Sequence, residues 1–216
     1  MEKEQSPGKN KRDFNKVAAL WDEKPRRVAL ASAVAEAIKQ NLTFDAKLDA
    51  LEFGCGTGLV TFNLVELLHH ITVVDSAEGM LAVVEQKAAQ LGIDNITAVH
   101  SNSTVPSLPA QHYDLVFSSM VLHHVADISH MLQVLITSLK PGGTIALADL
   151  DAEDGTFHAD PVGVEHHGVD RQWLCDELVK LGLVNVQHTT AYTIVKKRPQ
   201  GEQAYPVFFV WAQKPA

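Results

Sequence analysis

Cysteine is scarce in this sequence, and long apolar runs are absent from it. The two cysteines, Cys55 and Cys175, show no pairing pattern, which argues against a small secreted fold held by disulfides. No apolar run approaches the roughly 18 residues of a membrane-spanning helix, and the first residues lack the apolar core of a secretory signal. We therefore expect a cytoplasmic protein with no membrane partner.

Positive charge is also in deficit. The chain has 18 lysines and arginines against 26 aspartates and glutamates, which gives a formal net charge of −8. A nucleic-acid partner requires a basic surface, and the one dense basic cluster, residues 196–198, adjoins an expected turn. These observations argue against binding of DNA or RNA.

Aromatic residues make up only 6% of the chain, so its core must come mainly from aliphatic side chains; hydrophobic residues reach 46%. A length of 216 residues suits one core, and we expect a single domain over residues 1–216. Its oligomeric state is not determined by the sequence. Residues 1–12 are polar and predict a flexible tail, whereas residues 13–44 predict an N-terminal helical cap interrupted at Pro25.

Short apolar runs alternate with longer amphipathic ones after residue 45. The expected strands are residues 47–54, 71–75, 96–100, 113–119 and 143–150. The expected helices between them are residues 58–69, 77–91 and 127–139. This alternation is typical of an α/β fold with a doubly wound parallel sheet.

The last third of the chain has a different pattern. Asp170 is a suitable N-cap for a helix that ends near Gly182. Two β-rich runs, residues 184–197 and 206–214, flank the polar stretch 198–205 and predict an antiparallel hairpin. The segment 151–169, which follows the fifth strand, is expected to be a loop beside a site.

The stretch LEFGCGTG, residues 51–58, predicts a strand followed by a glycine turn that brings backbone N–H groups close to a ligand. Its spacing differs from the dinucleotide fingerprint, which would need a third glycine where Leu59 stands. Glu52 would repel a pyrophosphate and attract a cationic ligand. Asp75, at the end of the next strand, could accept hydrogen bonds from ribose hydroxyls. The alternative is that Glu52 pairs with a surface lysine and Asp75 caps a helix.

Four segments follow one another in the chain: LEFGCGTG, VVDSAEGML, YDLVFSSMVLHHV and LKPGGTIALAD. In order and spacing they resemble the motifs of class I S-adenosylmethionine-dependent methyltransferases, in particular a small-molecule group similar to the ubiquinone and menaquinone C-methyltransferases. The resemblance covers residues 47–150. It implies a Rossmann-like fold with seven mostly parallel strands and an antiparallel C-terminal hairpin, S-adenosylmethionine as cofactor, and a small-molecule acceptor.

The same resemblance implies roles for individual residues. The methionine end of the cofactor would lie against Glu52 and the loop, the ribose against Asp75, the adenine against Met80, and the ammonium against the carbonyl of Ser118. Trp21 would cover the cofactor, with ordinary core burial as its alternative. The full set of expected cofactor-binding residues is Trp21, Glu52, Gly54, Cys55, Gly56, Gly58, Asp75, Ser76, Met80, Asn102, Ser103 and Ser118.

Methyl transfer is an in-line displacement that an enzyme accelerates mainly by positioning, so a general base is optional. His123 and His124 follow the fourth expected strand and are candidate bases, with a packing role as the alternative. His158, His166 and His167 lie in segment 151–169 and are candidate acceptor-binding residues, with a solvated loop as the alternative. No metal site is expected, because no Cys or His spacing matches a zinc pattern.

Two other functions remain open from the sequence. A non-catalytic module that binds S-adenosylmethionine would keep the same glycine loop and acids. An NAD-dependent oxidoreductase is opposed by both Leu59 and Glu52.

Overall fold

The computed structural model of the protein describes residues 14–45, 47–101, 106–199 and 201–216. The expected tail of residues 1–12, together with Asn102 and Ser103, lies outside the described residues. Within the described part of the chain, no helix combines the length and the apolar character that crossing a bilayer requires.

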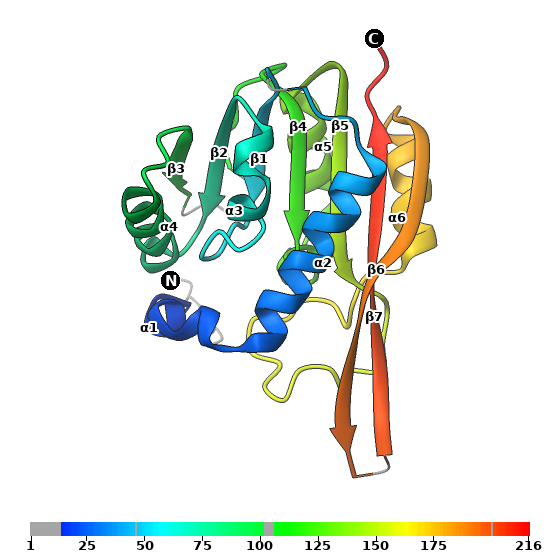
Figure 1. The fold of residues 1–216 in the computed structure, drawn as a ribbon. Coiled ribbons are helices and arrows are strands. Elements are labelled where there is room, and N and C mark those ends of the chain that lie inside the picture. Colours follow the sequence, from blue (N-terminus) through cyan, green and yellow to red (C-terminus); the bar gives the residue numbers. More distant parts are fainter. Residues whose placement is uncertain (1–13, 46, 102–105, 200) are drawn as a thin grey trace, which may run out of the picture.

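Seven strands of the described chain form one sheet in the order β3-β2-β1-β4-β5-β7-β6, shown in Figure 1. The first five pair in parallel, whereas β7 runs antiparallel to both β5 and β6. Their bounds are β1 Asp49–Phe53, β2 His70–Asp75, β3 Ile96–His100, β4 Tyr113–Ser119, β5 Leu139–Leu150, β6 Val184–Arg198 and β7 Gly201–Gln213. The strand order reverses between β1 and β4, where ligands of open α/β sheets bind at the carboxyl ends of the strands.

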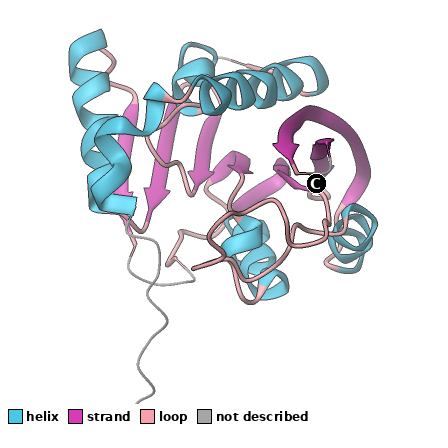
Figure 2. Ribbon diagram, turned by 90° about the horizontal axis from the view of Figure 1, so that it is seen from below, coloured by secondary structure: helices cyan, strands magenta, loops and turns pink. Residues whose placement is uncertain are grey.

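Helices cover both faces of this sheet, as Figure 2 shows. One core cluster joins the sheet to α2, α3 and α4, and a second joins the opposite face to α5 and α6. The helical elements are α1 Phe14–Val17, η1 Ala18–Glu23, α2 Pro25–Asn41, α3 Thr61–Leu64, η2 Val65–Leu67, α4 Glu78–Leu91, η3 Leu122–His124, α5 Ile128–Ser138 and α6 Arg171–Lys180. The α/β fold with its antiparallel hairpin is therefore confirmed.

Three predicted elements differ from the structure. The helix expected at 58–69 is reduced to the four residues of α3 and the short 3-10 helix η2, because Gly58 has a left-handed φ of +77° and the helix begins after it. The polar stretch 198–205, expected as a loop, is mostly strand, since pairing continues to Arg198 and resumes at Gly201. β5 also begins four residues earlier than predicted, at Leu139 rather than at 143.

The β6–β7 hairpin extends well past the carboxyl ends of the parallel strands (Figure 1). Ile194 and Tyr205 on this extension are 2% and 1% exposed and share a core cluster with Val34 and Ala35 of α2. Burial of these apolar side chains holds the extension against α2. The extension and α2 thereby close one side of the space at the carboxyl ends of the parallel strands.

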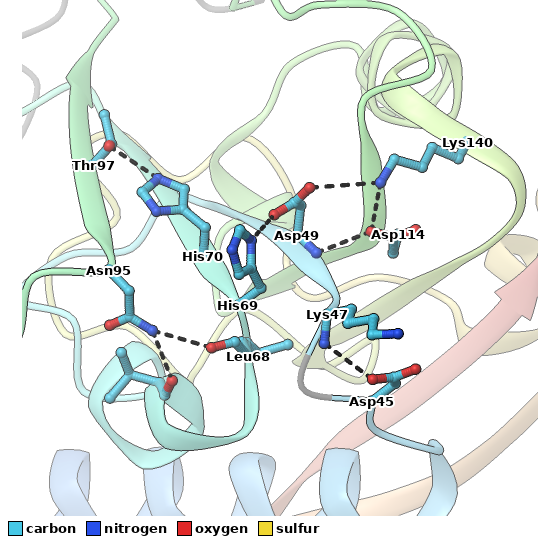
Figure 3. Close-up of polar contacts among 11 residues, drawn as sticks. Asp45, Lys47, Asp49, Leu68, His69, His70, Asn95, Thr97, Asp114 and Lys140 are labelled. Carbon is cyan, nitrogen blue, oxygen red and sulfur yellow. Dashed lines mark hydrogen bonds and ion pairs between the residues drawn. The ribbon is translucent and has the colours of Figure 1, made fainter.

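The opposite, amino-terminal edge of the sheet carries a polar network, shown in Figure 3. The Asp49 amide donates to Asp114 Oδ2 over 2.9 Å, and the Lys140 ammonium lies 2.7 Å from Asp114 and 3.6 Å from Asp49. The Asn95 side chain donates to the carbonyls of Val65 and Leu68. These contacts tie the starts of the strands together.

Candidate functional site

A cavity of about 670 Å³ opens at the carboxyl ends of β1, β2 and β4. Its walls come from the glycine loop after β1, from η1 and the start of α2, from η3, from segment 151–169 and from β6. The described residues of the expected cofactor set that line it are Trp21, Glu52, Gly54, Cys55, Gly56, Asp75, Ser76 and Met80. Most of the predicted cofactor site therefore shares one cavity.

The glycine loop needs glycine for two separate reasons. Gly54, Gly56 and Gly58 have φ values of +71°, +54° and +77°, which side chains rarely adopt. A Cβ on Gly54 would also lie 2.3 Å from Cγ2 of Val121, whereas a Cβ on Gly56 would have no atom within 4 Å. Gly58 is not part of the cavity lining; a Cβ there would meet the Phe62 ring at 3.0 Å.

Glu52 is a buried acid at the floor of the cavity, with 2% of its surface exposed. Its carboxyl group accepts a hydrogen bond from the Thr61 hydroxyl, so the alternative of a surface lysine partner is wrong. Burial, and to a lesser degree the nearby Asp75, raises the pKa of Glu52 to about 8. A cationic ligand beside this carboxyl group would favour its ionised form.

Asp75 ties the end of β2 to the loop. Its two carboxylate oxygens accept hydrogen bonds from the amide of Gly56, over 2.8 Å, and from the amide of Ala77, over 2.9 Å. Burial raises the pKa of Asp75 and outweighs these two hydrogen bonds, which lower it. A carboxylate has about four lone-pair sites, so both oxygens keep capacity for the hydroxyls of a ribose.

An apolar pocket wall lies on the N-terminal side. Met80 is 2% exposed and packs with Phe14, Ala18 and Trp21. The guanidinium of Arg27 stacks 3.4 Å from the centre of the Trp21 ring and donates to the Trp21 carbonyl over 3.1 Å. Trp21 thus lines the cavity and packs on its neighbours at once.

Two residues of the predicted cofactor set have buried side chains in the structure. Burial raises the pKa of the Cys55 thiol well above its usual value, which suits a packing residue. Ser118 is buried outside the cavity lining, and its hydroxyl donates to the Phe53 carbonyl over 2.7 Å. Ser119 and Met120 line the cavity instead, because side chains alternate along β4 and Met120 turns the chain with a φ of +60°.

The predicted histidines divide into two groups. His123, His124 and His158 line the cavity, with one ring nitrogen of each lying within 4.8 Å of the others. His166 and His167 do not line it. His166 bonds through Nε2 to the Val125 carbonyl, and the side chain of His167 is 60% exposed.

Asp149, near the end of β5, was missed by the sequence analysis. It is fully buried, and its Oδ1 lies 2.6 Å from Nδ1 of His123, which is 1% exposed. Burial opposes charge on His123, but Asp149 outweighs this effect and raises the pKa of the imidazole. The signal was weak because an acid within an apolar run does not reveal its partner.

A group of cations also went unrecognised: Lys24, Arg26, Arg27, Lys196 and Arg198, here called the basic wall. Lys196 and Arg198 alternate with the exposed Lys197 along β6, so two members of the basic cluster in the sequence face the cavity. Burial, then repulsion from Arg26 and Arg198, lowers the pKa of Lys196 to about 8. The cavity is thus lined by acids from β1 and β2 and by cations from the start of α2 and from β6.

Comparison with known proteins finds similarity to methyltransferases. Residues 50–143 match the family model described as a methyltransferase domain. An uncharacterised methyltransferase of Schizosaccharomyces pombe is 30% identical over 135 residues, which are 56% of this chain and 48% of the relative. A ubiquinone biosynthesis O-methyltransferase of Xanthomonas euvesicatoria is 27% identical over 162 residues, covering 71% of this chain and 67% of the relative.

Solved structures agree on the fold. An S-adenosylmethionine-dependent methyltransferase from Aquifex aeolicus superposes with a TM-score of 0.68 at 20% identity, and the match covers 94% of this chain and 99% of that protein. The present chain spans about half the length of several curated relatives it matches, with 48% to 50% of the relative covered in three of them. The domain matched over residues 50–143, the motif order and the fold together support a class I S-adenosylmethionine-dependent methyltransferase.

Proposed function

We propose that the protein transfers the methyl group of S-adenosylmethionine to a small organic anion bound against the basic wall. The observation that carries this proposal is the single cavity that is lined both by Glu52 and Asp75 and by Lys196 and Arg198. The acids suit the positively charged amino and sulfonium groups of the cofactor. The cations suit a carboxylate or phosphate on the acceptor, although the whole chain carries a net charge of −8.

The size of the cavity supports a small acceptor. A volume of about 670 Å³ lies within the usual range for cofactor and ligand sites, which is roughly 300–1,000 Å³. The Xanthomonas relative is named as an O-methyltransferase of ubiquinone biosynthesis. We infer a small-molecule acceptor for the present chain by this likeness.

The chemistry follows from positioning. The acceptor's nucleophilic atom forms a bond to the methyl carbon while the bond from that carbon to sulfur breaks, leaving S-adenosylhomocysteine. Alignment of the two reactants can contribute roughly 7–11 kcal/mol to the lowering of such a barrier. The role of His123 and His124 as bases stays a prediction, and Asp149 would orient His123 in that role.

The direct test uses cofactor labelled in its methyl group and a metabolite extract separated by anion exchange. We expect protein-dependent label in the retained, anionic fraction. Label confined to the unretained fraction would contradict the anionic acceptor, and no labelled product in any fraction would favour a cofactor-binding module without activity. A thermal shift with NAD but not with S-adenosylhomocysteine would support the oxidoreductase instead.

Replacing Lys196 by methionine is expected to raise KM for the acceptor at least about tenfold, because a charge-assisted contact contributes on the order of 1.5–3 kcal/mol. The matched control is Lys197→Met, which removes the same charge from an exposed neighbour on the same strand. Its KM should change less than about twofold, as for a surface charge. Equal changes of KM in the two variants would show that only the total charge of the protein matters, and would contradict a contact between Lys196 and the acceptor.

The pH dependence provides a second readout for the same residue. An anion binds the protonated ammonium, and the pKa of Lys196 is lowered to about 8. We therefore expect kcat/KM for the acceptor to fall as the pH rises through about 8, since this ratio reports ionisations of the free enzyme. A fall of the same size in Lys196→Met would assign the ionisation to another group.

A further inference from the structure

His123, His124 and His158 form a cluster whose parts come from distant segments. The first two residues lie in η3, directly after β4, and the third lies in segment 151–169. The His123 ring centre lies 4.1 Å from that of His124 and 5.1 Å from that of His158. One ring nitrogen of each residue lies within 4.8 Å of the others.

Two of these rings are held by hydrogen bonds through Nδ1. Nδ1 of His123 lies 2.6 Å from the carboxylate of the buried Asp149, and Nδ1 of His124 lies 2.6 Å from the carbonyl of Gly163. In both contacts the oxygen accepts, so Nδ1 of each ring carries the proton. A carboxylate or carbonyl behind a histidine is the usual support of a metal-binding imidazole.

The surrounding chain holds these supports in place. The amides of Glu165 and His166 both donate to the carbonyl of His123 over 3.0 Å, which fixes segment 151–169 to η3. Asp149 also accepts a hydrogen bond from the amide of Leu150 over 2.6 Å. Ligands from both segments are therefore carried by backbone that is itself hydrogen-bonded.

We propose that His123, His124 and His158 bind a divalent transition-metal ion, and that the open coordination position of this ion faces the acceptor end of the cavity. Three histidines with a vacant fourth position are the ligand set of catalytic zinc sites, and imidazole also suits iron, nickel and copper. In a tetrahedral zinc site with zinc–nitrogen bonds of about 2.0–2.1 Å, the ligand nitrogens lie about 3.4 Å apart. The nitrogens of the three histidines lie within 4.8 Å of one another, so the rings move closer together when the ion binds. This proposal differs from the expectation of no metal site, which depended on the spacing of Cys and His in the sequence.

The ion gives the cluster a role in catalysis, and this second step rests on the proposed methyl transfer. An acceptor hydroxyl or thiol that binds the ion releases its proton to solvent, because a metal ion lowers the pKa of its bound ligand. The resulting anion forms the bond to the methyl carbon as the carbon–sulfur bond breaks. No oxidant or reductant is required, and the metal keeps its oxidation state.

Metal binding is tested first, without reference to activity. The full-length protein is freed of metal with a chelator, dialysed and titrated with Zn²⁺ in competition with a chromogenic chelator. We expect one Zn²⁺ per chain with submicromolar affinity, and visible absorption bands of tetrahedral Co²⁺ when that ion is used as a spectroscopic probe. Absence of stoichiometric binding at micromolar Zn²⁺ would overturn the proposal.

The ligand assignment is tested with two variants of the same segment. His158→Gln is expected to weaken Zn²⁺ binding about 100-fold or more, whereas His167→Gln, an exposed neighbour outside the cavity, should leave it unchanged. A normal thermal shift of His158→Gln with S-adenosylhomocysteine shows that the variant is folded. Equal loss in both variants, or loss in His167→Gln alone, would contradict the assigned cluster.

The catalytic step is tested last. Methyl transfer by the metal-free protein should fall at least tenfold and return with Zn²⁺ or Co²⁺, while S-adenosylhomocysteine binding stays the same. If methyl transfer is unaffected by metal removal, the catalytic part of the proposal is wrong although the metal site stands. If no methyl transfer occurs with or without metal, the proposed function fails while the titration still decides the metal site.

Discussion

Replacing Glu52 by glutamine is expected to make the unliganded protein more stable while weakening its binding of S-adenosylmethionine. The pKa of Glu52 is raised from 4.5 to about 8 by burial. The unfolded chain therefore gives up this proton near pH 4.5, whereas the folded chain keeps it until about pH 8. The stability contributed by protonated Glu52 is complete below pH 4.5 and is lost as the pH rises to about 8.

The size of the gain follows from this difference. A pKa change of this size corresponds to about 4–5 kcal/mol at pH 8 and above. A glutamine carries a new buried amide group whose unsatisfied hydrogens cost about 1–3 kcal/mol. We expect a net gain on the order of 2 kcal/mol at pH 8, or a rise in Tm of roughly 4–8 °C for a chain of this length.

Chemical unfolding of both proteins from pH 5 to pH 9 measures this effect. The wild type should lose stability over the range and Glu52→Gln should lose less. Glu36→Gln is the matched control, because Glu36 is exposed on α2 and pairs with Lys39 on the surface. A less stable Glu52→Gln at pH 8 would show that the ionised carboxyl group supports the fold.

Cofactor binding should change in the opposite direction. We propose that the Glu52 carboxylate faces the cationic part of S-adenosylmethionine; its loss should then weaken binding at least tenfold, since contacts of charged groups contribute about 1.5–3 kcal/mol. Wild-type binding should also release protons near pH 7, which calorimetry in buffers of different ionisation enthalpy detects. Proton release that persists in Glu52→Gln would assign it to another acid.

Replacing Gly168 by alanine is expected to abolish methyl transfer while leaving cofactor binding in place. Gly168 has a φ of +72°, and a Cβ there would lie 2.1 Å from the Asp151 carbonyl oxygen and 2.6 Å from its carbon. Backbone atoms cannot move aside as a flexible side chain does. The substitution must therefore separate segment 151–169 from the end of β5, where Val169 donates to the Leu150 carbonyl over 2.8 Å.

The predicted loss of stability is about 3 kcal/mol or more, from the strained backbone and the overpacking together. Gly182→Ala is the control, because Gly182 has a φ of +88° but no atom within 4 Å of the added Cβ. Its loss should be about 1 kcal/mol. Urea unfolding measures the loss of stability, the turnover assay measures methyl transfer, and the thermal shift with S-adenosylhomocysteine measures cofactor binding. Retained turnover in Gly168→Ala would show that the segment does not need this docking.

The parts of the fold that could be predicted from sequence are those set by local pattern. The alternation of β and α runs was sufficient for the parallel sheet, and Asp170 caps α6 by accepting a hydrogen bond from the amide of Trp173. The glycine loop was recognisable because its strand, turn and acid are contiguous. The confirmed elements depend on neighbours in the chain rather than on distant contacts.

The residues that were missed depend on tertiary contacts. Asp149 and His123 lie 26 positions apart, and only the parallel pairing of β4 with β5 brings their segments together. The sequence also did not distinguish His158 from His167, because the path of segment 151–169 determines which one faces the cavity. Lys196 was interpreted as a surface charge because the sequence did not predict that β6 extends past the parallel strands.

The position of the β6–β7 extension has a consequence for how this domain diversifies. The matched methyltransferase domain spans residues 50–143, and the hairpin lies entirely after it. A descendant could therefore exchange the outer half of one contiguous hairpin and acquire a new acceptor preference, while the glycine loop that we expect to bind the cofactor stays unchanged.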